Sequence, residues 1–185
     1  MKFSALPESA HEIVVLRPIV AADIAVWYDY LSQPLVFEHT SWDLQSPADL
    51  SPYIWAPETF TPSTMLRLAV ALRSTGELVG TAGFHTVSAP NRTAELAYDL
   101  TPAMWGKGIA TDICGLLVDW AHSDVGLVRI QATTLETNER SVRVLKRCGF
   151  EPEGLLRSYR MVRGQPGNFF MYSHVLQDFG ATANE

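Results

Sequence analysis

The sequence predicts an α+β fold in which helices flank a mixed, mostly antiparallel central sheet. In the middle of the chain, three strand-like runs follow one another with only short turns between them, which is typical of an antiparallel meander. Strand and helix patterns then alternate before a final hairpin. No change in composition marks a boundary, so residues 1–185 are predicted to form a single domain with its core over about 13–178.

Composition narrows the class of protein. A chain of 185 residues, 47% of them hydrophobic, is long enough to bury a substantial core. The formal charge is −6 and the basic residues are scattered, which argues against binding to nucleic acid. The two cysteines, Cys114 and Cys148, fit no metal-ligand pattern, so we expect no metal site and two free thiols in a reducing cytoplasm. No apolar run approaches the roughly 18 residues of a membrane span, which predicts a cytoplasmic protein without a membrane partner.

The first third of the chain predicts a strand and two helices. Residues 13–16 are rich in β-branched side chains, as a strand should be, and residues 21–31 carry apolar side chains at helical spacing until a proline stops them. Residues 35–46 are expected to be irregular. A serine and a first-turn proline then favour a short helix over about 47–55, which Pro52 should break.

The rest of the chain predicts the sheet and two longer helices. The three strands of the meander are followed by alternating helices and strands, and glycines mark several of the turns. In order, we expect strands at 65–73, 78–87 and 94–100, a helix at 107–122, a strand at 127–134, a helix at 138–147, and a hairpin of 150–162 with 169–176 around a turn at 163–167.

A glycine loop lies between the strand at 94–100 and the helix that follows it. The two glycines of Trp105-Gly106-Lys107-Gly108-Ile109-Ala110 let the backbone approach a ligand closely. A helix that begins directly afterwards presents free N–H groups and the positive end of its dipole, which together favour phosphate. Lys107 lies between the glycines, so this is no P-loop, and Thr111 stands where a Rossmann fingerprint has its third glycine. The loop therefore predicts a site for a phosphorylated cofactor.

Further motifs give the loop a family resemblance. Together with the loop, they resemble the GNAT N-acetyltransferase superfamily and, more narrowly, its branch with the ribosomal-protein N-terminal acetyltransferases (RimJ/RimL type). The resemblance spans roughly residues 14–178. The motifs are Leu16-Arg17-Pro18 with Asp23, Trp105 to Thr111, Asn138-x-x-Ser141, and Leu145-x-x-x-Gly149-Phe150-x-x-Glu153-Gly154.

The resemblance implies acetyl-CoA as co-substrate. Backbone amides of the glycine loop would hold the diphosphate, the end of the strand at 94–100 would bind the pantetheine arm, and Asn138 would lie beside the thioester. Trp105 stands where the superfamily commonly has Gln or Arg. The residues implied to contact acetyl-CoA are Asp99, Leu100, Thr101, Trp105, Gly106, Lys107, Gly108, Ile109, Ala110, Thr111 and Asn138.

Acetyl transfer needs a base that takes a proton from the amine, directly or through water. Glu95 is our candidate, because it matches a carboxylate that serves as base in several superfamily members. Strand alternation places Glu95 and Asp99 on one face and Tyr98 on the other. The alternative is that Glu95 is an ordinary exposed strand carboxylate. His85 and Asp99 are lesser candidates for the base.

The leaving thiolate needs a hydrogen-bond donor. Many superfamily members have a tyrosine seven residues after the asparagine, but this position is Leu145 here. Ser141 is the replacement that the resemblance implies, as a donor that stabilises the thiolate. The alternative is that Ser141 only caps or packs its helix.

Aromatic residues offer less specific signals. The aromatic residues expected in the core, with one or two at the mouth of a substrate site, are Phe37, Trp42, Trp55, Tyr159 and Tyr172. Near the final turn, the branch often has Asp-His, whereas this chain has Asn168-Phe169. This difference removes one substrate contact of the branch and puts the acceptor of the closest subfamily in doubt.

We therefore expect an N-acetyltransferase that acts on a primary amine by direct attack in a ternary complex. A protein N-terminus, a polyamine-like metabolite, an amino-acid derivative and an aminoglycoside-like compound all remain open as acceptors. The net charge of −6 mildly favours a cationic acceptor. The alternatives are a catalytically silent acyl-CoA sensor and, less consistent with the meander, a Rossmann-like nucleotide-binding domain. A homodimer is compatible with the resemblance.

Overall fold

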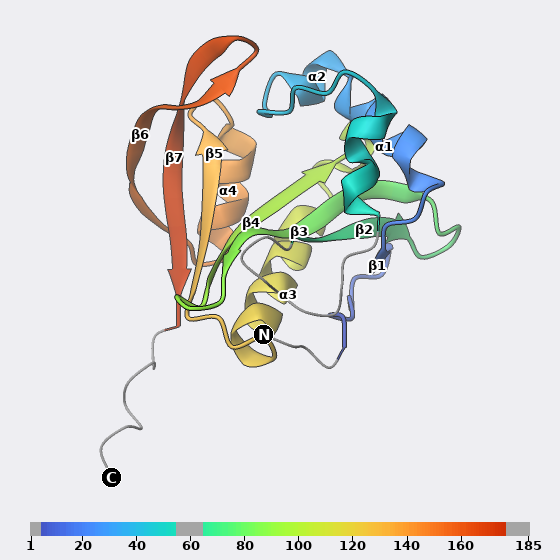
Figure 1. The fold of residues 1–185 in the computed structure, drawn as a ribbon. Coiled ribbons are helices and arrows are strands. Elements are labelled where there is room, and N and C mark those ends of the chain that lie inside the picture. The colour runs from blue at the N-terminus through green and yellow to red at the C-terminus, as the bar shows by residue number, and fades with distance from the viewer. Residues whose placement is uncertain (1–4, 55–64, 177–185) are drawn as a thin grey trace.

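The computed structural model describes residues 5–54 and 65–176, which form a seven-stranded sheet covered by helices on both faces (Figure 1). The strand order is β1-β2-β3-β4-β5-β7-β6. The strands are β1 Val14–Pro18, β2 Leu66–Leu72, β3 Leu78–Ser88, β4 Thr93–Leu100, β5 Arg129–Leu135, β6 Glu151–Val162 and β7 Gln165–Val175. The helices are α1 Asp23–Leu31, α2 Pro34–Phe37, α3 Ile109–Ser123 and α4 Glu139–Arg147, with 3₁₀ turns η1 Pro47–Tyr53 and η2 Pro102–Met104.

The pairing confirms the predicted mixed sheet. Neighbouring strands run antiparallel everywhere in the described sheet except between β4 and β5, which are parallel. A Rossmann-like domain needs a largely parallel sheet, so that alternative is excluded. No helix in residues 5–54 or 65–176 is long and apolar enough to cross a membrane.

Two apolar clusters attach the helices to the sheet. On one face, α3 and α4 bury side chains such as Leu117 and Leu145 against the sheet, and on the other face α1 and η1 do so with Trp27 and Leu50. Each of these four side chains is almost fully buried, which contributes about 1.5–3 kcal/mol for a typical large apolar side chain. Both faces of the central strands are therefore covered by helices.

The pairing between β4 and β5 is short. Thr93–Glu95 pair with Arg129–Gln131, but β3 continues beside β4 as far as Leu100. Beyond Glu95 the two strands diverge (Figure 1). One edge of β4 thus has no neighbouring strand over its second half.

Two expectations about local structure were wrong. Pro34 does more than stop α1, because it begins the short helix α2, where a first-turn proline loses no hydrogen bond. The turn between β6 and β7 contains only Arg163 and Gly164, with φ of 51° and 77°. Two left-handed residues match the twist of a tight hairpin, so β7 begins earlier than predicted. Trp55 lies outside the described residues.

Gly83 in β3 provides a test of the sheet packing. A Cβ at this position would overlap the backbone carbonyl of Leu66 in β2. We expect Gly83→Ala to lower the free energy of unfolding by about 1–3 kcal/mol, measured by urea denaturation.

The matched control is Gly115→Ala in α3, where a Cβ would meet no atom within 4 Å. Because alanine favours a helix over glycine, this change should raise the free energy of unfolding by about 0.5–1 kcal/mol. Equal stabilities of the two variants would contradict the described packing.

Candidate active site

Two cavities meet where β4 and β5 diverge. The loop cavity, of about 510 Å³, lies between the glycine loop with the start of α3 and the helix α4. The strand cavity, of about 300 Å³, lies among β4, β5, the β6–β7 hairpin and the residues that follow α2. Five residues line both cavities and mark their junction: His39, Thr40, Tyr98, Asn138 and Ser141.

The glycine loop forms one wall of the loop cavity. Gly106 and Gly108 have φ of 77° and 81°, and a Cβ at either position would meet no atom within 4 Å. Their left-handed backbone favours glycine, and the space in front of them is open. Gly108 caps α3, so the amides of Ile109 and Ala110 have no acceptor within the helix. Both residues line the cavity, which suits an anionic group.

The opposite wall is cationic. Arg140, Arg143 and Arg147 line the cavity from α4 at helical spacing. Arg140 lies over the ring of Trp105, 4.2 Å from its centroid, and the indole N–H of Trp105 donates to the carbonyl of Leu100 at 2.9 Å. The sequence predicts scattered basic residues, whereas these three arginines share one face of α4. The spacing 140–143–147 was the signal that could have grouped them.

The free edge of β4 faces the junction. The N–H of Thr101 donates to the carbonyl of Val79 at 2.9 Å, so this pair belongs to the hydrogen-bonded positions of the β3–β4 ladder. Hydrogen-bonded and non-hydrogen-bonded pairs alternate along an antiparallel ladder. Asp99 therefore also directs its backbone groups to β3, whereas Tyr98 and Leu100 direct theirs to the gap between β4 and β5. Of the residues implied to contact acetyl-CoA, three line neither cavity: Asp99, Thr101 and the exposed Lys107.

The carboxylate of Asp99 is enclosed by hydrogen-bond donors of the fold. It is buried and accepts hydrogen bonds from Tyr30 of α1, Arg67 of β2 and Thr81 of β3. Burial, followed by the charge of Asp99, raises the pKa of the Tyr30 hydroxyl well above its usual value, so this phenol keeps its proton. The side chain of Asp99 thus connects α1 to the sheet.

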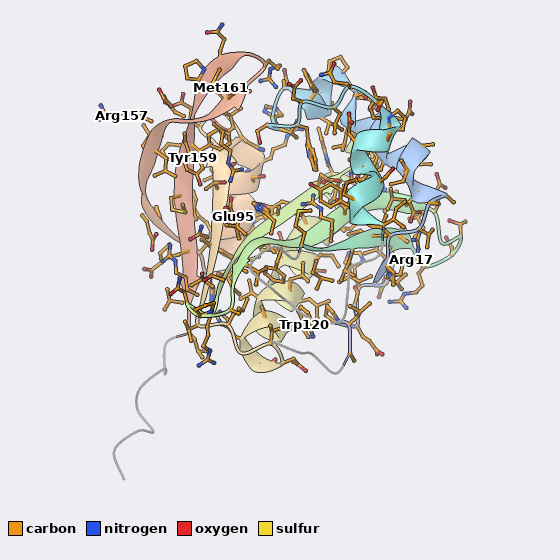
Figure 2. The ribbon with its side chains drawn as sticks, in the orientation of Figure 1. Arg17, Glu95, Trp120, Arg157, Tyr159 and Met161 are labelled. Atoms are coloured by element: carbon orange, nitrogen blue, oxygen red, sulfur yellow. The ribbon has the colours of Figure 1, made fainter. Side chains whose placement is uncertain are left out.

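Glu95 lies at the point where β4 and β5 diverge (Figure 2). It lines the strand cavity and is only 2% exposed, so it is not an ordinary exposed strand carboxylate. Its Oε1 accepts hydrogen bonds from Thr133 Oγ1 at 2.5 Å and from the Arg160 guanidinium at 2.9 Å. His85 Nε2 is 3.8 Å away, and burial is the main cause that lowers the pKa of this imidazole. His85 is therefore neutral at pH 7.

Asn138 and Ser141 lie together at the junction, as the motif implied. Asn138 caps α4, and its Oδ1 accepts from the backbone N–H of Ser141 at 3.1 Å. The hydroxyl of Tyr98 donates to the carbonyl of Ser141 at 3.4 Å, and burial raises the pKa of this phenol, so it stays protonated. The hydroxyl of Ser141 has no hydrogen-bond partner among the described residues. The strand pattern alone had not marked Tyr98 as a site residue.

Residues 37–40 begin with the last residue of α2 and are held by side chains from the other side of the cleft. Arg163 in the hairpin turn donates to the carbonyls of residues 37, 38 and 40, at 2.8, 3.2 and 3.3 Å. The amide of Asn138 donates to the carbonyl of residue 39 at 3.2 Å. Two side chains from the other side of the cleft thus bind four successive carbonyls, and they hold this segment against both cavities.

Comparison with known proteins shows the family to which this chain belongs. Residues 14–151 match the family of acetyltransferase (GNAT) domains. The chain therefore belongs to the GNAT acetyltransferase family, whose members transfer an acetyl group from acetyl-CoA, and the expected fold and enzyme class are confirmed. No group of three or more metal-binding side chains occurs among the described residues.

Individual relatives agree with this class. The chain is 38% identical to the uncharacterized N-acetyltransferase YoaA of Bacillus subtilis over 110 residues, which span 60% of this chain and 62% of YoaA. It is 28% identical to the uncharacterized N-acetyltransferase p20 of Bacillus licheniformis, over 91% of this chain and 96% of p20. Mycobacterium smegmatis RimJ, solved with CoA-disulfide, has the same fold, with a TM-score of 0.74 and 23% identity over 94% of this chain and 90% of that chain.

Gly108 provides a test of the loop cavity. A valine at this position would be strained at φ of 81° and would fill the space in front of the α3 amides. We expect Gly108→Val to weaken CoA binding by at least about 10-fold, or about 1.4 kcal/mol, in a calorimetric titration.

Gly76→Val is the matched control, because Gly76 has a similar φ of 74° and open space but lies in the turn between β2 and β3. Like Gly108→Val, it should lower the free energy of unfolding by about 1–2 kcal/mol, but it should leave the CoA affinity unchanged. A similar loss of CoA affinity in both variants would show that strain alone is responsible.

Proposed function

We propose that this chain transfers the acetyl group of acetyl-CoA to a primary amine bound in the strand cavity. The observation that carries the proposal is the junction of the two cavities. On one side lies a cavity with free helix amides and three arginines, and on the other a cavity with the buried carboxylate of Glu95.

The loop cavity has the chemistry that CoA requires. The amides of residues 108–110 would hold the diphosphate, and the arginines of α4 would bind phosphate oxygens as forked donors. The free edge of β4, at Tyr98 and Leu100, offers backbone groups to the amides of the pantetheine arm. Bound in this way, acetyl-CoA supplies an activated acyl group at the junction.

Residues at the junction, and Glu95 in the strand cavity, take part in the two proton transfers. The neutral amine nitrogen bonds to the acetyl carbon while the carbon–sulfur bond breaks, so the nitrogen must lose one proton, and CoA leaves as a thiolate that then takes a proton from water. Glu95 receives the amine proton, through a water molecule where the distance requires it. The free hydroxyl of Ser141 donates a hydrogen bond to the departing thiolate, and the Tyr98 hydroxyl gives up its 3.4 Å bond to the carbonyl of Ser141 to donate a second one.

A panel of primary amines tests the proposal, with thiol release from acetyl-CoA as the measurement. Release with at least one acceptor supports it. Binding of CoA without release on any acceptor would favour the silent acyl-CoA sensor. Absence of both binding and release would overturn both functions.

Glu95→Gln should lower kcat by about 10²- to 10⁴-fold, because it removes the base and keeps the shape of the side chain. The CoA affinity should stay the same, since Glu95 does not line the loop cavity. Steady-state kinetics and calorimetry measure the two effects.

The control is Glu153→Gln. Glu153 lines neither cavity and is bound by Arg129 at 2.6 Å and Ser173 at 2.7 Å, so its replacement should leave kcat unchanged. Full turnover of Glu95→Gln would remove Glu95 as the base.

Ser141→Ala and Tyr98→Phe should each lower kcat by about 10- to 100-fold, the value of one hydrogen bond to a charged group. Both changes keep the backbone that lines the loop cavity, so the dissociation constant of CoA should change little. If CoA binding weakened as much as kcat fell, these hydroxyls would have a binding role instead.

A further inference from the structure

Arg160 of β6 presents unused hydrogen-bond donors to the strand cavity. Its side chain is 32% exposed and lines this cavity. One N–H group donates to Glu95, and the other donors of the guanidinium form no hydrogen bond within residues 5–54 and 65–176. A guanidinium with a free edge is a ready partner for a planar anion.

Two aromatic rings fix the orientation of this guanidinium. Its carbon lies 5.0 Å from the ring centroid of Tyr159 and 5.6 Å from that of Phe169, and these rings pack edge to face. Phe169 stands where the similar branch often has a histidine. Asn168 before it bonds to Ser158 and Glu136 and so stabilises the hairpin. The rings thus hold the Arg160 guanidinium where it lines the strand cavity.

The charges in the strand cavity do not suit a polycation. Glu95 is the one carboxylate among its described lining residues, and it is already bound by Arg160. Arg67 also lines this cavity and is paired with the buried Asp99. A polyamine or an aminoglycoside would bring several ammonium groups, each of which needs its own partner when it leaves water. The net charge of the chain is therefore a poor guide to this cavity.

Aromatic side chains form part of the remaining wall of the strand cavity, next to polar side chains such as Thr133 and Thr134. Trp42 and Tyr53 line the cavity and pack edge to face with each other, with ring centroids 5.7 Å apart. The segment 37–40, bound by Arg163 and Asn138, holds the adjoining wall in place. A volume of about 300 Å³ is at the small end of ligand pockets.

We propose that the acceptor is a small amino acid-like amine with a carboxylate and an apolar or aromatic side chain. Its carboxylate binds the free edge of Arg160, its amine lies toward Glu95 and the junction, and its side chain packs against Trp42 and Tyr53. The opposite charges of the Glu95–Arg160 pair thus match those of a zwitterion. This inference rests on the proposed function and names the class of its acceptor.

Matched acceptors test the role of the carboxylate. Phenylalanine, leucine and methionine are each compared with the corresponding amide, and phenylalanine also with phenethylamine, while spermidine represents the polycations. Thiol release from acetyl-CoA yields kcat and KM. At least one amino acid should have a KM about 10- to 100-fold below that of its amide, as expected for a hydrogen-bonded charge pair.

Arg160→Gln should bring the KM ratio of amide to amino acid close to 1, whatever its effect on kcat through Glu95. Arg157→Gln is the control, because Arg157 is exposed on the same strand, lines neither cavity and points away from the cleft (Figure 2). This variant should keep the ratio of the unmodified protein. An unchanged ratio in Arg160→Gln would overturn the proposal.

Binding without chemistry separates this inference from the proposed function. In the complex with CoA, which has no acetyl group to transfer, calorimetry should show binding of the preferred amino acid and a loss of about 10- to 100-fold in Arg160→Gln. If amides, phenethylamine or spermidine are acetylated as well as the amino acids, the acceptor class is wrong and the acetyltransferase stands. If the Arg160-dependent binding occurs but no amine releases thiol, the site stands and the proposed function fails. If no amino acid of the panel binds, the acceptor class is overturned.

Discussion

The site depends on the short pairing between β4 and β5. Three residue pairs join these strands, and beyond Glu95 the backbone groups on one edge of β4 face a gap instead of a neighbour. Backbone N–H and C=O groups away from water need partners, so such an edge favours a ligand that carries amides of its own. The same divergence brings the start of α4 and the glycine loop to one side of the gap and the β6–β7 hairpin to the other. The loop cavity and the strand cavity thus arise from a single departure from regular sheet geometry.

The pair of buried Glu95 and half-buried Arg160 gives the strand cavity its charges. Taking two charges out of water is costly, and their attraction offsets that cost only in good geometry. Here the carboxylate is also bound by Thr133, while the guanidinium is supported by two aromatic rings and keeps a free edge. An arrangement of this kind contributes little to stability compared with an apolar packing of the same volume. In the proposed function, its value lies in presenting a base and an anion site next to each other.

Local patterns explain which features could be predicted from the sequence. The glycine loop, the meander and the helix that starts next to Asn138 depend on neighbours within a few residues, and all appear close to where they are expected. Tyr98 and Arg160 were missed because their roles depend on partners far along the chain, 43 and 65 residues away. The same holds for Arg163, whose partners lie more than 120 residues earlier. Strand alternation could assign a face to Glu95, but not the guanidinium that lies beside it.

The hydrogen bonds that hold residues 37–40 from across the cleft all go to carbonyl groups of that segment, and Arg163 also lies over the ring of Phe37. Every amino acid has a carbonyl, so these hydrogen bonds impose no requirement on the side chains at the four positions. His39 and Thr40, which line both cavities, can therefore be exchanged during evolution while the backbone beneath them keeps its place. Such an arrangement separates the shape of the scaffold from the identity of the residues that meet the acceptor. Related chains can diversify their acceptors at this segment without rebuilding the site for acetyl-CoA.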